Sequence, residues 1–179
     1  MTGKIECRMI PTGTILLILF LLGGCAHTWS PRPVSPVPME SVGPLSPGLS
    51  VHLVNDQPLT PPQLFFTDVG HTHHANYNEW TDYFIRYWGE ELTKRGVAVG
   101  PQSRNTISVK LDGFWAHHVF VVHNAGMKVH LSSPDNTWSK EFIETDSSGM
   151  GLGGALGNVV HLTVEKLMRN PDVLDRMKP

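Results

Sequence analysis

The chain of 179 residues contains little cysteine, no excess of positive charge and no long hydrophobic run. Cys7 and Cys25 are its only cysteines, which excludes a framework of several disulfides and a zinc centre built from several thiolates. Lysine and arginine number 14 against 16 acidic residues, so there is no basic field for nucleic acid or an anionic membrane surface. The longest apolar run, Ile15–Leu22, is much shorter than the about 20 residues of a membrane-spanning helix.

Residues 1–24 have the layout of a secretory signal peptide. Lys4 and Arg8 make a positive start, the apolar run Ile15–Leu22 follows, and two glycines come directly after it. Because the apolar run is too short to stay in the bilayer as a helix, we predict that this segment is removed from the mature protein.

The last four residues of this pattern, LGGC, resemble the bacterial lipobox, in which leucine and two small residues precede a cysteine. The resemblance implies that Cys25 is lipidated, that the chain is cut before it, and that it becomes residue one. Cys7 lies in the discarded segment, so the mature protein would have no free thiol and no disulfide. In lipoproteins of this kind an aspartate after the cysteine signals inner-membrane retention. Since Ala26 stands there, we expect the outer membrane, with the rest of the chain in the periplasm.

Proline dominates the segment that follows the cysteine. Residues 26–48 contain six prolines, at positions 31, 33, 36, 38, 44 and 47. Proline lacks a backbone donor and fixes φ, so we predict that residues 25–48 form an extended tether behind the lipidated cysteine. An unstructured terminus without any particular reach is the alternative. The folded periplasmic domain is predicted to cover residues 49–179, as a single domain of ordinary size.

Two amphipathic helices are predicted in this domain. Asn76 begins the first, whose apolar residues recur at helical spacing up to Gly96, a typical end signal. The second follows the glycines at 149, 153 and 157 and ends at Asn170-Pro171. Glycines four apart allow close backbone approach on a helix face, but we favour a flexible loop that leads into the helix.

The strands are predicted from alternating apolar residues. A short strand over residues 50–55 precedes the first helix, and an apolar patch at 64–66 is either a brief strand or core. After the helix, Ile107, Val109 and Leu111 alternate with polar residues. Asn124-Ala125-Gly126 is predicted as the turn of the next hairpin, and Trp138 to Thr145 as the last strand.

These elements predict an α+β fold, with an antiparallel meander of about four strands and two amphipathic helices in the order strand, helix, strands, helix. The hairpin turn assigns six residues to the face covered by the helices: Val119, Val121, His123, Met127, Val129 and Leu131. The other face would then carry His118, Phe120, Val122, Lys128 and His130.

The layout as a whole resembles the YajG-type outer-membrane lipoproteins. The local similarities are KRGVAVGP at residues 94–101, VNDQP at 54–58 and RNPDVLDRM near the C-terminus. Val97 departs from the pattern, because an aromatic residue is usual there. The resemblance implies an envelope lipoprotein of no established activity, and it supplies no catalytic residue.

The sequence HTHH at residues 71–74 is the strongest candidate for a metal site. His71 and His73 in an extended chain would lie on one side, and His74, His118 or His130 could complete a zinc or copper shell. The cluster contains no cysteine or carboxylate and lacks helical metal-ligand spacing, so a polar loop is the simpler interpretation. We predict no metal ligands and no cofactor, and keep a histidine-rich metal-binding lipoprotein as the alternative function.

Signals for catalysis are weak. There is no nucleophile elbow, phosphate-binding loop or zinc-protease motif, and Asp112 and Asp146 are as easily turn residues as strand-end acids. We therefore predict no enzyme and no catalytic residue, and a lipoprotein anchored through Cys25 that acts as an interaction module of the envelope. Its partner would be an envelope protein or a second copy of the chain. The strip of His118, Phe120, Val122 and His130 is the predicted contact surface unless part of the tether or the 56–70 segment covers it.

Overall fold

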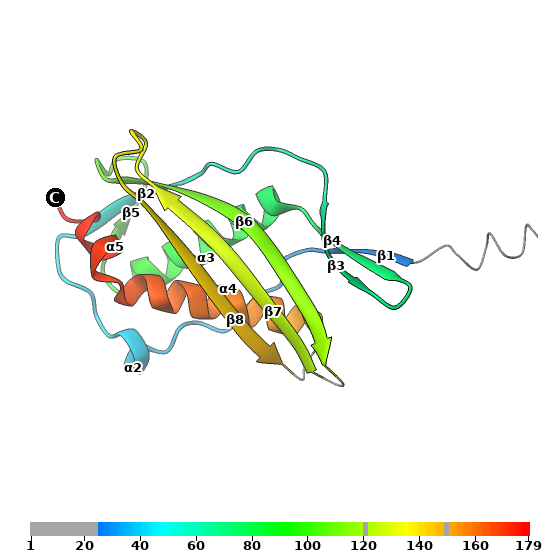
Figure 1. Ribbon diagram of the computed structural model, residues 1–179. Helices are drawn as coiled ribbons and strands as arrows, with labels where there is room; N and C mark the ends of the chain where they lie inside the picture. The colour runs from blue at the N-terminus through cyan, green and yellow to red at the C-terminus, as the bar shows by residue number, and fades with distance from the viewer. Residues whose placement is uncertain (1–24, 120–121, 149–150) are drawn as a thin grey trace, which may run out of the picture.

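The computed structural model describes residues 25–119, 122–148 and 151–179. They form a five-stranded sheet with two long helices behind it and a separate three-stranded sheet at one end (Figure 1). The strands are β1 (Cys25–Trp29), β2 (Ser50–Asn55), β3 (Gln63–Asp68), β4 (His71–Ala75), β5 (Ala98–Val99), β6 (Thr106–Val119), β7 (Val122–Ser132) and β8 (Ser139–Ser148). The helices are α2 (Met39–Val42), α3 (Tyr77–Lys94), α4 (Leu152–Arg169) and α5 (Pro171–Asp175).

The five-stranded sheet has the order β5-β2-β6-β7-β8 and is mixed rather than antiparallel. The strands β6, β7 and β8 form the expected antiparallel meander, but β2 pairs in parallel with both β5 and β6. The α+β class is confirmed, whereas the antiparallel four-stranded sheet is wrong. The reason lies in the connection, because β2 and β6 are joined by a long crossover that includes α3, and such crossovers join parallel strands.

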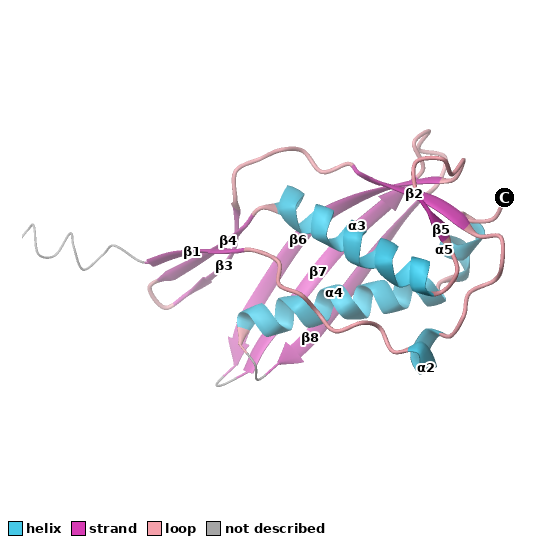
Figure 2. Cartoon of the chain, turned by 180° about the vertical axis from the view of Figure 1, so that it is seen from behind, coloured by secondary structure: helices cyan, strands magenta, loops and turns pink. Residues whose placement is uncertain are grey.

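Both long helices cover the same face of this sheet, which we call the core face (Figure 2). Helix α3 packs against β2 and β6, and α4 packs against β7 and β8. The predicted start of α3 is confirmed, since the Asn76 side chain accepts hydrogen bonds from the backbone N–H groups of Asn78 and Glu79. We call the opposite face of the sheet the open face, since no helix lies over it in Figure 1.

The hairpin between β6 and β7 differs from the predicted one. Asn124, Ala125 and Gly126 lie inside β7 and pair with β8, while β6 continues to Val119. The glycine is required for another reason than a turn: a Cβ at position 126 would overlap the indole of Trp115 on β6. The predicted contact residue Phe120 lies outside the described residues.

A β-bulge in β6 reverses the predicted faces beyond it. Leu111 pairs with Val129 but Gly113 pairs with Lys128, so β6 contains one extra residue at Asp112. His118 consequently lies opposite His123, on the core face, whereas His130 lies with Lys128 on the open face. The predicted strip of His118 and His130 on one face is therefore wrong. His123, Met127, Val129 and Leu131 do share the core face, as expected, whereas the side chains of Val119 and Val121 lie outside the described part of the chain.

Residues 30–48, which we call the strap, lie against the helices instead of standing apart as a tether. The strap runs along α3 and α4 before it reaches β2 (Figure 2). The Val34 N–H donates to the Tyr83 hydroxyl at 3.0 Å, and Val37 is 3% exposed. Proline removes donors but leaves carbonyl groups and side chains that can pack, and this explains why a proline-rich segment is part of the folded body.

The strap is also held by a buried ion pair. Glu91 of α3 and Arg95, which directly follows α3, lie 2.8 Å apart with both side chains fully buried. The Glu91 carboxylate accepts the Val37 N–H at 3.2 Å, and Arg95 donates to the Val37 carbonyl at 2.7 Å. The backbone N–H and carbonyl groups of Val37, which lies outside any helix or strand, are thus both satisfied by charged side chains.

The glycines of α4 accommodate the N-terminal segment. Gly153 and Gly157 lie inside the helix rather than in a preceding loop, and Gly149 lies outside the described residues. A Cβ at Gly153 would lie 3.0 Å from the Trp29 ring, and one at Gly157 would lie 3.0 Å from Val34. The four-residue spacing therefore serves close approach of β1 and the strap to α4.

Candidate functional site

The predicted lipidation residue, Cys25, lies at the free end of the three-stranded sheet. The sheet has the order β1-β4-β3, and β1 pairs in parallel with β4 so that Cys25 lies opposite His71. The side chain is exposed, and the backbone N–H donates to the carbonyl of Gly70 at 2.9 Å. Nothing protein-derived therefore covers the thiol in the described part of the chain, and chemical modification of this group remains a prediction.

A tight turn between β3 and β4 lies beside Cys25. It is made by Val69 and Gly70, and Gly70 has φ of 71°, which a glycine adopts without strain. Val69 is 92% exposed. Its N–H donates to the Asp68 carboxylate at 2.6 Å, and this bond lowers the pKa of Asp68, with a smaller contribution from His118. The end of the sheet thus presents an apolar side chain directly beside the cysteine.

The HTHH segment forms β4 and not the polar loop expected from its composition. His27 of β1 lies between the rings of His71 and His73, with ring centroids 5.1 and 5.4 Å away. The His27 Nε2 and His71 Nδ1 atoms are 2.9 Å apart, and the Trp29 indole N–H donates to His73 Nδ1 at 2.9 Å. Burial lowers the pKa of His73, and the neighbouring His27 lowers it further.

The hydrogen bonds determine what this histidine cluster can do. An indole N–H is only a donor, so His73 Nδ1 must hold the lone pair and the neutral ring carries its proton on Nε2. Neither nitrogen of His73 is then free to bind a metal. The His27 and His71 nitrogens share one hydrogen bond, which uses one donor and one acceptor. His74 Nε2 contacts the Thr72 hydroxyl at 3.2 Å. In this arrangement the cluster joins β1 to β4 through hydrogen bonds and ring stacking.

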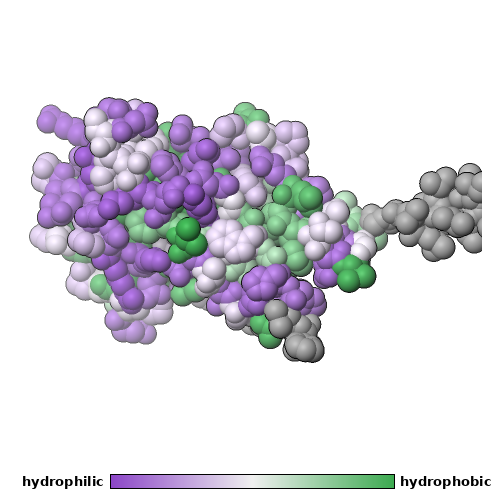
Figure 3. Space-filling model, in the orientation of Figure 1, coloured by the Kyte–Doolittle hydropathy of each residue, from purple (hydrophilic) through white to green (hydrophobic). Residues whose placement is uncertain are grey.

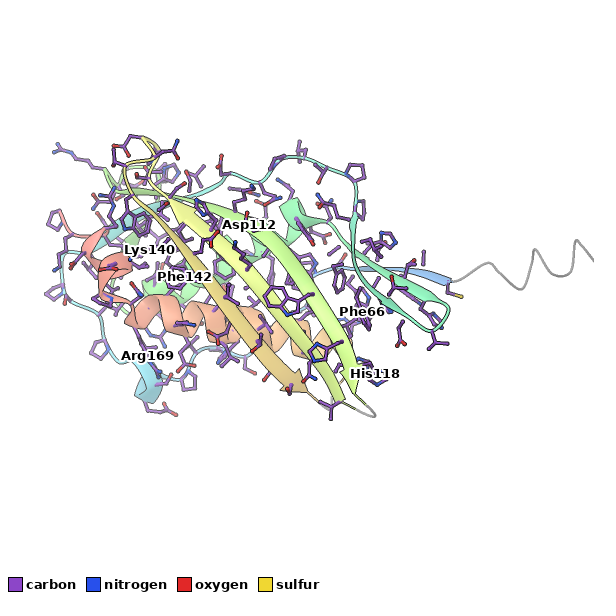
Figure 4. All side chains as sticks on the ribbon, viewed as in Figure 1. Phe66, Asp112, His118, Lys140, Phe142 and Arg169 are labelled. Carbon is purple, nitrogen blue, oxygen red and sulfur yellow. The ribbon has the colours of Figure 1, made fainter. Side chains whose placement is uncertain are left out.

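Aromatic and polar contacts join the small sheet to the large one. The Phe65 and Phe114 rings lie 6.0 Å apart, and the Asp68 carboxylate lies 3.5 Å from His118 Nδ1. His118 stacks on His123 with centroids 4.3 Å apart. Figure 4 labels Phe66 on β3 and His118 at the end of β6, on the side where the two sheets meet.

A second cluster, which the sequence alone does not indicate, lies on the open face. Asp112, His130 and Glu141 have donor atoms within 4.8 Å of one another, the one such group of three among the described residues. The bulge at Asp112 places this carboxylate beside the cross-strand pair of His130 and Glu141. Only the position of the bulge could have revealed it, and no sequence signal marks that position.

Two lysines already neutralise this cluster. Lys128 Nζ lies 2.6 Å from Glu141 and 4.0 Å from Asp112, and Lys110 Nζ lies 3.4 Å from Asp112. The hydrogen bond between Lys128 and Glu141 lowers the pKa of Glu141 and raises the pKa of Lys128. A divalent cation would therefore have to displace an ammonium group. The other strand-end acid, Asp146, accepts a hydrogen bond from Asn158 of α4 at 3.0 Å.

Several solved structures show a weak likeness to this chain. A protein from Xanthomonas campestris, XCC0632 of family DUF330, is 12% identical with a TM-score of 0.48, over 84% of this chain and 94% of that one. Lipoprotein GNA1162 from Neisseria meningitidis is 15% identical with a TM-score of 0.32, over 68% of this chain and 99% of that one. These scores are too low to support an argument about activity. No family model and no curated protein matches the sequence.

The resemblance to YajG-type lipoproteins therefore stays a prediction. None of the helices in the described part of the chain has the length and apolar character of a membrane span.

Proposed function

We propose that this protein is a lipoprotein of the bacterial outer membrane, anchored through acylated Cys25, whose α+β domain acts in the periplasm by contact with another protein and without catalysis. The observation that carries the proposal is the position of Cys25. It follows a complete signal pattern and is the last residue of a lipobox-like tetrapeptide, and its side chain is exposed at the end of an edge strand. The resemblance to YajG-type lipoproteins supports the envelope location and the lipid anchor, and it implies no established activity.

The geometry around Cys25 is compatible with both steps of lipoprotein processing. An exposed thiol accepts a diacylglycerol without unfolding the sheet. After cleavage the nitrogen of Cys25 is the new N-terminus, and as an acylated amide it retains the N–H that donates to Gly70 in this structure. Several acyl chains on one residue give stable anchoring, because each buried methylene adds about 0.8 kcal/mol.

The open face of the five-stranded sheet is the proposed contact surface. It presents the Trp115 indole, lying across Gly126, and Ile143, which is 53% exposed. Charged residues of the Asp112, His130 and Glu141 cluster lie on the same face. An aromatic ring and an aliphatic side chain bordered by charged groups are typical of the centre of a protein interface.

The anchor is tested by mass spectrometry of the mature protein from membranes. We expect an N-terminal peptide that begins at acylated Cys25, found in the outer-membrane fraction of a density gradient. Cys25→Ser should leave an unprocessed or unlipidated form, and Cys7→Ser should be processed normally as the matched control. An exported protein that still carries Met1 would contradict the proposal.

The contact surface is tested by crosslinking in cells. A photoreactive residue at Ile143 should capture one envelope protein or a second copy of the chain. The same group at Glu90, exposed on α3 and remote from the open face, is the control and should capture neither. Equal capture from both positions would show that the open face has no special role.

A further inference from the structure

We propose that the tip of the three-stranded sheet, formed by Cys25 and the turn Asp68–His71, lies in the headgroup region of the bilayer, with the Val69 side chain in contact with lipid. This inference rests on the proposed function, because it assumes that Cys25 is acylated. It adds the orientation of the domain and a second membrane contact that is independent of the acyl chains.

The first argument is that there is no linker between the anchor and the folded body. Cys25 is itself the first residue of β1, pairs opposite His71, and is hydrogen-bonded to Gly70 at 2.9 Å. The strand continues into Trp29, whose carbonyl accepts the Trp80 indole N–H at 2.8 Å. Acyl chains on Cys25 would therefore leave the protein directly at the tip, and the bilayer surface must meet the protein there.

The second argument is the apolar side chain at the tip. Val69 is 92% exposed, more than any other large hydrophobic residue in the described part of the chain. Its neighbour Gly70 holds Cys25, so Val69 points from the same end of the sheet as the lipid. An exposed apolar residue gains free energy when lipid replaces the water around it. Figure 3 shows hydrophobic residues gathered more densely toward this end than toward the opposite end of the molecule.

The charge of the tip identifies the kind of surface it fits. Residues 68–71 and 25–26 contain one carboxylate, one histidine and no lysine or arginine. A basic patch that binds anionic headgroups is therefore absent from the tip, and apolar contact is the attraction that remains. We expect the contact to depend little on salt, unlike binding through clustered basic residues.

Site-directed fluorescence in the mature lipoprotein tests this orientation. Because acylation blocks Cys25 and processing removes Cys7, Val69→Cys provides a single thiol for a polarity-sensitive dye. The labelled protein is reconstituted into vesicles of phosphatidylethanolamine and phosphatidylglycerol that contain spin-labelled phosphatidylcholine. The matched control is Leu59→Cys, because Leu59 is 88% exposed but precedes β3, whose first residue lies roughly 17 Å from the tip at the rise of a strand.

We expect the emission of the dye at position 69 to be shifted to the blue. The lipid spin label should quench it at least about twofold more than it quenches the dye at position 59. Flotation of the vesicles and the mass of Cys25 report the anchor separately. A protein without acyl groups that does not float would overturn the proposed function. If the protein floats with the vesicles but the dye at position 69 reports an aqueous environment, only the proposed orientation is overturned. A dye shielded from water but not quenched by lipid would show that protein covers the tip, and would also overturn it.

Discussion

The two sheets of this protein are stabilised in different ways. The five-stranded sheet buries a continuous apolar face under α3 and α4, where Val129 and Leu131 are 1% and 0% exposed. In the three-stranded sheet Ala75 is the one fully buried apolar residue, and histidine stacking and hydrogen bonds provide the remaining contacts. Stability that comes from buried apolar area is lost only on global unfolding, whereas a sheet with few buried contacts opens locally.

The smaller sheet is therefore the part of the protein that can respond to its surroundings. The candidate anchor lies on the sheet that is easier to open, and the strap connects that sheet to the helices of the larger one. The strap is held at two places, by its close packing on the glycines of α4 and by the buried pair of Glu91 and Arg95. Changes at the strap, in the core and in the histidine cluster should therefore have effects of decreasing size, as the following predictions state.

Arg95→Ala should have the largest effect, because it removes the group that holds both Glu91 and the strap. The variant leaves a buried carboxylate whose remaining partners are the half-exposed Lys94 at 2.6 Å and the Val37 N–H at 3.2 Å. Breaking a buried ion pair from one side costs about 3 kcal/mol or more of unfolding free energy. Urea denaturation followed by circular dichroism measures the loss. Lys94→Ala, on the half-exposed side of the same carboxylate, is the control and should cost well under half as much.

Leu131→Ala tests the core of the larger sheet. The side chain is 0% exposed on β7, and its truncation should cost about 2–5 kcal/mol through lost burial and a cavity. Leu64→Ala on β3 is the matched substitution in the smaller sheet. Leu64 is 54% exposed, so we expect at most about 0.5 kcal/mol. Equal losses in a urea titration would mean that the two sheets do not differ as proposed.

The elements that could be predicted from sequence are those with local signals. Helix α3 has a capping asparagine and a regular apolar stripe, and the end of α4 has Asn170 followed by proline. In the turn after Ser132, Asn136 has φ of 55°, a conformation that asparagine tolerates, so residue type is a local signal there too. The candidate lipidation residue, Cys25, is marked by the same kind of local signal, because the tetrapeptide LGGC consists of neighbouring residues.

The errors concern features that depend on contacts between distant residues. One extra residue at Asp112 changes the face of every later residue in β6, yet alternating apolar residues do not reveal a bulge. The local sequence around Gly126 favours a turn. The real reason for the glycine is the space that the Trp115 indole needs, and Trp115 lies eleven positions away in sequence. The strap was misassigned because proline content indicates the absence of regular structure, while its packing depends on Glu91 and Arg95.

The pH dependence of the two sheets should differ. Burial lowers the pKa of His73 below its ordinary value of 6.5, so the unfolded strand binds a proton more readily than the folded one. The resulting stability is complete above pH 6.5 and is lost as the pH falls below it.

Hydrogen exchange measured between pH 7.5 and 5.5, with rates corrected for intrinsic exchange, tests this difference. The amides of β1 and β4 should lose protection while those of β7 keep it. His73→Phe removes the titrating group and retains a ring against Phe66, whose centroid lies 5.2 Å from that of His73. This variant should reduce the loss. A loss of protection at the same pH in both sheets would refute the explanation.

Zinc should produce the smallest effect, and it distinguishes the histidines of the small sheet from the cluster on the open face. The hydrogen bonds of His73 and the pairing of His27 with His71 leave no ready set of three donors. On the open face, a cation must displace Lys128 from Glu141. We therefore expect calorimetry to give binding no tighter than about micromolar, with no change in the triple alanine variant of His71, His73 and His74.

Lys128→Ala removes the competing ammonium group, so it should tighten binding, and His130→Ala in that background should abolish the gain. Submicromolar, stoichiometric binding that disappears in the triple variant would instead restore the histidine sheet as a metal site, because it would require the rings to exchange their hydrogen bonds for metal ligation.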